Sequence, residues 1–389
     1  MKHLQRRPTG SVESHPASSR RWSRRVAFAI AAALLVLVVP VHSYVSALTT
    51  PGDAAWTTRT VDWLRDHGAS PLVDAAENFW FGLHPPSNQA PGADVLPLVE
   101  KPQIPRQGGT TALPRLVDAY EQHPVDGERT WQIRRLDSRG AALVATSFLR
   151  PDPDHAGVVA AVAWVRGSGV QAHLVAGTTM PGGPTWPGHA DVPRSDVPAL
   201  VATLNSGWRT KDISGGFRLG TQTWPALKPG QATAVIDSHG RLDVGAWGRD
   251  VGSSSDVAAA RQNLALVVDD GQPAVGLDSN ANHQWGYRDN QHQFTYRSGM
   301  GVDRSGNLVY VAGPGMTLSV LAQALADAGA VRAMELDVHH DFPFFAVWEH
   351  AGGSDRATKL LGSMASSADR YLRPDQRDFF YLTIAKTAS

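Results

Sequence analysis

Short runs of apolar residues, separated by turn residues, fill the chain from about residue 141 to its end. Some runs alternate apolar and polar residues and others are apolar throughout, and both patterns are typical of β-strands with one or two buried faces. Strong hairpin signals, 237–240 and 303–306, separate two pairs of these runs. The expected strands are 141–149, 157–165, 169–176, 198–204, 232–236, 242–247, 263–268, 294–302, 308–311, 331–338 and 379–384.

One helix is expected among these strands. Thr317 is a good N-cap, Leu318, Leu321 and Leu325 share one face, and Gly329 stops the helix. Strands therefore outnumber helices, and no regular βαβ alternation is present. This pattern predicts an α+β domain built on a mixed or antiparallel sheet with few helices.

The N-terminal part carries a long apolar run, 26–48, which holds no charged residue. A helix of this length can cross about 30 Å of hydrocarbon. Four arginines between residues 20 and 25 should stay in the cytoplasm, which places the C-terminal body outside. The long basic segment and Pro40 favour an uncleaved single-pass anchor in the cell membrane. The alternative is a signal peptide cleaved after Ala47, which would release a secreted protein.

Two amphipathic segments follow the apolar run and predict a helical hairpin, broken near His67 and Gly68. A stretch rich in proline and glycine then separates this hairpin from the main domain. The expected organisation is a basic cytoplasmic tail 1–25, a transmembrane anchor 26–48, the hairpin 53–83, a linker 84–110 and the main domain 111–389.

Composition narrows the classes of function. Lys and Arg number 36 and Asp and Glu also number 36, so the balanced charge gives no reason to expect a nucleic-acid partner. Without cysteine, the chain has neither disulfides nor thiolate chemistry. Its 12 tryptophans suit sugar-binding surfaces and apolar cores equally well.

A late stretch, 334–350, concentrates polar groups between two apolar runs. On a regular strand, Glu335, Asp337, His339 and Asp341 would share one face, with His340 on the other. Such a set supplies an acid/base pair or ligands for a divalent metal. A polar turn between two buried strands explains the same residues without chemistry, and no cofactor is required by the pattern.

Two further strand ends carry candidate binding residues. Asn205 can donate and accept hydrogen bonds, Gly207 allows close approach to the backbone, and Arg209 can clamp a phosphate. Arg297 and Gly301 lie on a later strand, where the arginine could hold an anion. The alternatives are a satisfied corner at Asn205 and an exposed strand arginine at 297. Neither a phosphate-binding Gly-Lys-Ser/Thr loop nor a G-x-S-x-G elbow is present.

The order of these motifs resembles a known family. LNSGWR is followed by GGFRLG, TAVIDSHGRLDVGAWG, YRSGMGVDRSGNLVYVAG, the helix TLSVLAQALADAGA and AMELD. This order is similar to the phosphodiester glycosidase domain family, which is related to the uncovering enzyme N-acetylglucosamine-1-phosphodiester alpha-N-acetylglucosaminidase. The resemblance covers roughly residues 158–348, and the anchored N-terminus with WLRDHG looks like an actinobacterial membrane-anchored branch.

The resemblance implies roles for particular residues. The segment 205–208 occupies the family's Asn-Gly-Gly-Phe type motif, and Arg297 with Gly301 matches its arginine motif. The family's Leu-Asp-Gly-Gly-Gly-Ser motif is matched through Leu336 and Asp337 only, because residues 338–341 are Val, His, His and Asp. These bulkier side chains imply a pocket of different shape, with either a different substrate or lost activity.

The expected function is an extracytoplasmic hydrolase that cleaves a sugar-1-phosphodiester in a cell-wall or exopolysaccharide glycan. Asp337 would be the catalytic carboxylate, His339 or His340 its acid/base partner, and Glu335 or Asp341 the reserve carboxyl. Asn205, Gly207, Arg209, Arg297 and Gly301 would bind the substrate. The alternative is a non-catalytic envelope protein that binds glycan or assists polysaccharide biosynthesis or export.

Overall fold

The computed structural model describes residues 26–27, 38–92, 96–97, 112–117, 124–252, 256–286, 290–351 and 354–385. The chain divides into two compact units, 1–50 and 51–389. In the first unit, residues 38–49 are helical. In the described part of the chain, no helix is both long and apolar enough to span a bilayer. Residues 28–37 of the predicted anchor lie outside that part, so the anchor remains a prediction.

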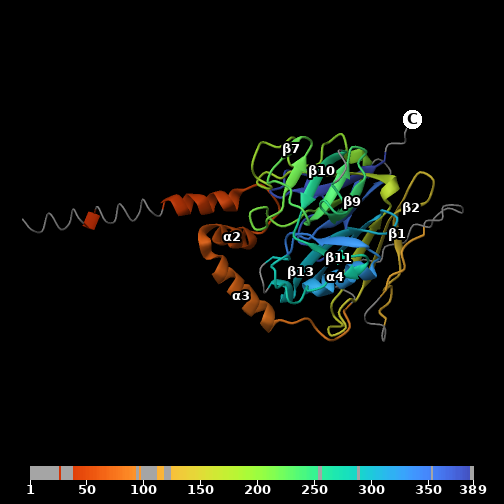
Figure 1. Cartoon of the computed structure of the whole chain (residues 1–389), viewed down its shortest axis with the longest axis horizontal. Coiled ribbons are helices and arrows are strands. Elements are labelled where there is room, and N and C mark those ends of the chain that lie inside the picture. The colour runs from red at the N-terminus through yellow and green to blue at the C-terminus, as the bar shows by residue number, and fades with distance from the viewer. Residues whose placement is uncertain are drawn as a thin grey trace, which may run out of the picture. The chain divides into compact units, whose positions relative to one another are not determined.

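Three sheets make up most of the second unit, and all pairings between their strands are antiparallel (Figure 1). In spatial order the first sheet holds β1 (Gln132–Leu136), β2 (Ala142–Leu149), β3 (Ala160–Val165), β14 (Leu308–Met316), β13 (Thr295–Val302), β15 (Arg332–Glu335), β11 (Leu266–Asp269) and β12 (Gln272–Pro273). The second holds β7 (Gln222–Thr223), β6 (Phe217–Leu219), β10 (Val257–Gln262), β8 (Ala232–Asp237) and β9 (Leu242–Ala246). The third holds β17 (Ser354–Lys359), β16 (Phe345–Ala351), β5 (Leu200–Asn205), β18 (Phe379–Ile384) and β4 (Val170–Val175).

One apolar core joins the three sheets. Its largest cluster takes side chains from each of them, among them Val144, Leu204 and Phe217. Alternate residues of the first sheet face the other way, where they pack against α4 (Leu318–Asp327). The Thr317 hydroxyl accepts a hydrogen bond from the Val320 N–H, as its N-cap position predicts. The predicted α+β class, with few helices, is confirmed.

A helical hairpin precedes the sheets. It consists of α2 (Trp56–Leu64), a π-helical turn (Arg65–Ala69) and α3 (Ser70–Leu83). Gly68 has a φ of 84° in that turn, which breaks the helix where the sequence predicts a break. The hairpin belongs to the second unit, together with the sheets.

Some strand predictions are wrong in extent. The strand expected over 331–338 ends at Glu335, because the backbone turns away there and His339 adopts a left-handed φ of 73°. The strands β1, β6, β7, β10, β12, β16 and β17 are not among the expected strands, although β16 begins with an apolar run.

Candidate active site

A cavity of about 870 Å³ opens where the ends of β5 and β15 and the starts of β13 and β18 meet the hairpin. Both charged and aromatic side chains line it, which suits a ligand that is part anion and part sugar. The charged and polar lining includes Asp62, Arg65, Asp66, Glu77, Arg209, Lys211, Asp212, Asp337, His339, His340 and Arg377. The aromatic lining includes Phe81, Trp208, Phe294, Tyr296 and Phe342.

Asp337 lies two residues beyond the end of β15 and is 6% exposed. Its backbone N–H donates to the Ser206 carbonyl at 2.9 Å, which fixes the residue against the end of β5. One carboxylate oxygen accepts from the Val338 N–H at 3.0 Å, and the other lies 3.3 Å from Arg377. Burial raises the pKa of Asp337 to about 7, against the lowering effect of Arg377. This carboxyl therefore holds its proton up to near-neutral pH.

Arg377, which precedes β18, links Asp337 to the hairpin. Its second guanidinium nitrogen lies 3.4 Å from an Asp62 carboxylate oxygen, and the guanidinium stacks 4.2 Å from the centre of the Phe342 ring. The neighbouring Asp378 pairs with the buried Arg261 at 2.7 Å, which holds this segment in place. Arg377 is thus held by several contacts and lines the cavity.

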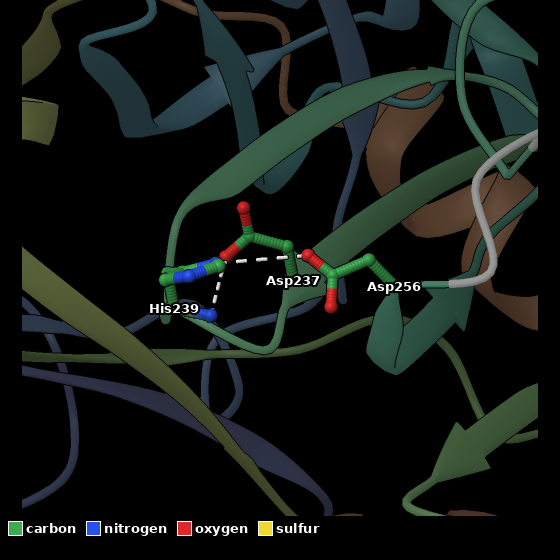
Figure 2. A group of neighbouring side chains, drawn as sticks. All are labelled: Asp237, His239 and Asp256. Carbon is green, nitrogen blue, oxygen red and sulfur yellow. Dashed lines mark hydrogen bonds and ion pairs between the residues drawn. The ribbon is translucent and has the colours of Figure 1, made fainter.

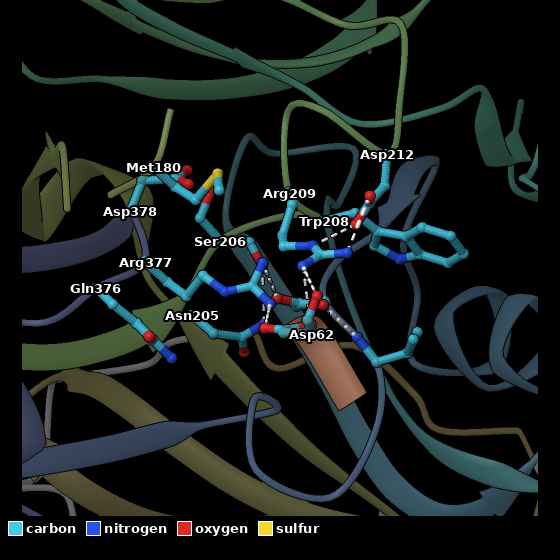
Figure 3. A network of polar contacts seen from close by, with 12 residues as sticks. Asp62, Met180, Asn205, Ser206, Trp208, Arg209, Asp212, Gln376, Arg377 and Asp378 are labelled. Carbon is cyan, nitrogen blue, oxygen red and sulfur yellow. Dashed lines mark hydrogen bonds and ion pairs between the residues drawn. The ribbon is translucent and has the colours of Figure 1, made fainter. Parts of the chain in front are cut away.

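Arg209 also contacts the Asp62 carboxylate. Its guanidinium lies 3.1 Å from Asp62 and 3.2 Å from Asp66, and it also pairs with Asp212. Figure 3 shows Asp62, which α2 supplies, between Arg209 and Arg377. Two arginines from different loops therefore converge on a single anionic group.

The two adjacent histidines differ in environment. His339 is half-buried and lines the cavity, and burial lowers its pKa to about 4, with a further contribution from the Arg65 charge. At neutral pH its imidazole is uncharged. His340 is exposed and lies 3.3 Å from Asp341. His339 occupies a position where the family resemblance places glycine, and its left-handed φ is one that glycine adopts without strain.

Asp341 fixes the hairpin to the domain. Its carboxylate accepts from the Ala55 N–H at 2.8 Å and from the Thr58 hydroxyl at 2.6 Å, at the start of α2. Partners at this helix end lower the pKa of Asp341, although burial opposes them. The prediction that Asp341 shares a strand face with Asp337 is wrong, because the strand ends before both residues.

Asn205 connects strands. Its side-chain oxygen accepts from the Tyr310 hydroxyl at 2.8 Å and from the Phe344 N–H at 2.9 Å. Its side-chain nitrogen donates to the Ser206 carbonyl and to the Ser298 hydroxyl. With these bonds made and the residue buried, Asn205 holds the end of β5 in place and does not line the cavity.

Arg297 and Glu335 form a second enclosed pair. Their side chains meet at 2.5 Å, and both residues are almost fully buried. Arg297 also donates to the carbonyls of Met316 and Asn290. Burial raises the pKa of Glu335, and Arg297 opposes that effect. Neither residue lines the cavity, so the structure brings neither of them to the predicted site.

The two candidate glycines serve packing. A Cβ atom on Gly207 would lie 2.8 Å from the Asn263 side chain, and one on Gly301 would lie 2.3 Å from the Arg332 carbonyl oxygen. Both positions therefore exclude a side chain because neighbouring segments approach closely. Asn263 uses that proximity to accept from the Trp208 N–H at 3.0 Å.

The structure adds residues that the sequence pattern did not single out, chiefly Asp62, Arg65 and Arg377. Arg377 lies in a charged segment directly before the last predicted strand, which is a weak signal for a strand-end site. Asp62 is a charged residue flanked by Val61 and Trp63 in an amphipathic helix. No local pattern indicates that these segments meet.

The predicted metal ligands do not converge in the cavity, since Glu335 pairs with Arg297 and Asp341 binds α2. Among the described residues, metal-ligating groups come together at the β8–β9 turn, where Asp237, His239 and Asp256 have atoms within 4.8 Å of one another (Figure 2). Asp237 there already accepts the N–H groups of His239 and Arg241. This cluster does not line the candidate site.

Residues 218–337 match the model of a protein family that is described as phosphodiester glycosidase. The search of curated proteins found no match. Three solved structures are similar to parts of the chain. A hypothetical protein from Synechocystis has 13% identity and a TM-score of 0.36, with 63% of this chain and 62% of that chain covered. This chain thus spans less than two thirds of that protein.

The catalytic domain of zebrafish N-acetylglucosamine-1-phosphodiester alpha-N-acetylglucosaminidase, auto-inhibited by its pro-peptide, has 15% identity and a TM-score of 0.38, with 66% and 87% covered. A putative exported protein from Burkholderia pseudomallei has 11% identity and a TM-score of 0.28, with 59% and 74% covered. The actinobacterial branch remains a prediction. Residues 218–337 of this chain are therefore similar to the phosphodiester glycosidase family.

Proposed function

We propose that this chain hydrolyses the glycosidic bond of a sugar-1-phosphodiester and that the reaction takes place in the cavity around Asp337. One observation carries the proposal. A buried carboxyl with a pKa of about 7 lies 3.3 Å from an arginine that faces the same cavity. A proton donor beside an anion-binding group is what cleavage next to a phosphate requires.

The protonation states of Asp337 and His339 are complementary. Burial raises the pKa of the carboxyl to about 7 and lowers the pKa of the imidazole to about 4. Between these values the carboxyl is protonated and the imidazole is neutral. The pKa values of two groups in one cavity are thus shifted in opposite directions, which supports Asp337 as the acid and His339 as the base.

The proposed step breaks the bond between the anomeric carbon and the phosphate oxygen. Asp337 donates its proton to that departing oxygen, and a water molecule attacks the anomeric carbon. His339 accepts the proton that the water loses. The products are a free sugar and a phosphomonoester, and the two protons return the site to its starting state by exchange with solvent.

Arg209 and Arg377 would hold the phosphodiester. In the structure both contact the Asp62 carboxylate, at 3.1 and 3.4 Å. A phosphodiester carries one negative charge, like the carboxylate, and two of its oxygens can meet two guanidinium groups. Substrate binding would therefore exchange Asp62 for the phosphate between the two arginines.

The aromatic side chains of the cavity would bind the sugar through the apolar faces of its ring. Trp208 lines the cavity, and its orientation is fixed because its indole N–H donates to the Leu336 carbonyl at 3.0 Å. The chain's apolar run 26–48, preceded by arginines, supports a location at the outer face of a membrane. The proposed substrate is accordingly a cell-wall or exopolysaccharide glycan.

The test uses purified protein and a synthetic sugar-1-phosphodiester. The proposal predicts release of free sugar, unchanged by a metal chelator, because Asp337, His339 and the arginines supply the required groups. Binding of the substrate without release of sugar would favour the alternative, a non-catalytic envelope protein that binds glycan. Loss of turnover on chelation would replace the proposed acid/base step with a metal-dependent one.

A further inference from the structure

The helix α3 carries its apolar side chains on the outside. Its exposed positions are all apolar or glycine, whereas Asp74 and Glu77 are half-buried. Leu72 is 75% exposed, Phe79 is 71% exposed and Leu83 is 59% exposed. A surface helix of a water-soluble body normally has the reverse arrangement. The exposed set is Pro71, Leu72, Ala75, Ala76, Phe79, Trp80, Gly82 and Leu83.

The inner face of the same helix explains why the apolar face points outward. Asp74 and Glu77 each pair with Arg65 at 2.7 Å, and Phe81 lines the cavity. Asn78 accepts a hydrogen bond from Gln293 of the domain. These contacts fix the rotation of α3, so its apolar face cannot turn inward without breaking them.

The contacts at α2 hold the hairpin against the domain as well. Asp341 binds its first turn and Asp62 binds two arginines of the domain. Trp56, at the start of α2, is 69% exposed and adds a further aromatic side chain to the hairpin surface. The apolar face therefore belongs to the second unit, which also holds the three sheets.

We infer that this outer face of the hairpin binds the surface of a lipid bilayer. The binding partner must suit an apolar surface, because α3 exposes leucine, phenylalanine and tryptophan but no charged side chain. Aromatic and aliphatic side chains of this kind enter the boundary between headgroups and acyl chains, and tryptophan is enriched there.

The position of the hairpin in the sequence supports a bilayer over a second copy of the chain. The apolar run 26–48 ends eight residues before Trp56, and eight residues span at most about 28 Å. A chain anchored through that run would keep the hairpin at the membrane surface in every copy. A bilayer is then always within reach of the apolar face, whereas a second copy is not.

This inference stands apart from the proposed hydrolase activity, although it has a consequence for it. The inner face of the hairpin supplies Asp62, Arg65 and Glu77 to the cavity, and the outer face would rest on lipid. The cavity would therefore lie one helix thickness from the bilayer. Substrates held at the membrane would reach it directly.

The test relies on the absence of cysteine from the chain. Full-chain variants Phe79→Cys and Leu83→Cys would each carry one environment-sensitive fluorophore. The protein would be placed, one copy per disc, in nanodiscs of phosphatidylethanolamine and phosphatidylglycerol. Val275→Cys is the matched control, because Val275 is an apolar residue that is 98% exposed on the domain.

We expect labels at 79 and 83 to shift their emission to the blue and to be quenched by nitroxides on the acyl chains. Their depth should be about 5–10 Å below the headgroup surface, as for an interfacial helix. The label at 275 should show neither effect. Labels at 79 and 83 that match the control would overturn the inference, as would protein that fails to associate with lipid. Discs that hold several copies are measured in parallel, and shielding that occurs only in those discs would assign the face to self-association instead.

Discussion

Two arginine–carboxylate pairs take their carboxylates, Glu335 and Asp337, from positions two residues apart, yet the pairs have different surroundings. Glu335 is the last residue of β15 and meets Arg297 inside the domain, where backbone carbonyls accept the remaining N–H groups of the arginine. Asp337 lies beyond the strand and meets Arg377 at the wall of a cavity.

The difference shows that two carboxylates near one strand end can have different roles, one in stability and the other in the proposed reaction. The enclosed pair has exchanged water for fixed protein partners and is closed to any ligand. The cavity pair is buried enough to displace the pKa of Asp337, yet its arginine is shared with Asp62, a residue on another element. We therefore assign stability to the first pair and function to the second.

The largest effect should follow from Asp337→Asn. Removal of a positioned acid lowers turnover by about 10²- to 10⁴-fold. Release of free sugar measures turnover, and the far-UV circular dichroism of the variant should match that of the native protein. Glu335→Gln is the matched control and should retain turnover per folded molecule. Equal losses in both variants would erase the distinction between the two pairs.

Arg297→Met should act on stability. It leaves the fully buried Glu335 without its counter-ion, which costs about 3–5 kcal/mol in the free energy of unfolding. Urea denaturation measures the loss. Arg377→Met should cost less, because the cavity gives Asp337 access to solvent and the carboxyl can remain protonated. A greater loss for Arg377→Met would contradict the comparison.

Arg377→Gln should weaken substrate binding. Hydrogen bonds to charged groups contribute about 1.5–3 kcal/mol, so the KM for a sugar phosphodiester should rise by roughly 10- to 100-fold. Inhibition by inorganic phosphate should weaken in parallel. An unchanged KM would exclude Arg377 as a phosphate ligand, and Arg209 alone would then carry that role.

The pH dependence of activity follows from the two displaced pKa values. Asp337 must be protonated and His339 neutral, so kcat/KM should fall below about pH 4 and above about pH 7. For unfolding, protonated Asp337 stabilises the native state fully at pH values below its ordinary pKa. That contribution is lost as pH rises through about 7. Asp337→Asn should remove this loss, and an identical pH profile of stability in both proteins would contradict the assignment.

Asp62→Asn should give the smallest effect and the opposite sign. The side chain of Asp62 is 26% exposed, and partly exposed pairs contribute about 0.2–1 kcal/mol. Since its carboxylate competes with the phosphodiester for two arginines, the KM should fall by about two- to fivefold. A higher KM in this variant would mean that Asp62 assists binding.

The sequence pattern predicted the fold class, the main antiparallel strands and the capped helix α4, because alternation and turn residues are local signals. It did not predict the short edge strands such as β7. It also extended β15 through Val338, because hydrophobic periodicity does not show where His339 takes a left-handed backbone.

Part of the candidate site could be predicted from the sequence. Asp337, His339 and Arg209 line the cavity, whereas Arg297 and Asn205 are as polar and as close to strand ends but face inward. Arg377 and Asp62 come from segments far away in the chain. Tertiary packing decides whether an arginine donates to a buried carbonyl or lines a cavity. A local sequence pattern does not predict that packing.

The most direct test is hydrolysis of a sugar-1-phosphodiester in water labelled with ¹⁸O, with both products weighed by mass spectrometry. Attack at the anomeric carbon predicts that the label enters the free sugar and that the phosphomonoester stays unlabelled. Label in the phosphomonoester would show cleavage at phosphorus and contradict the account, as would the absence of either product.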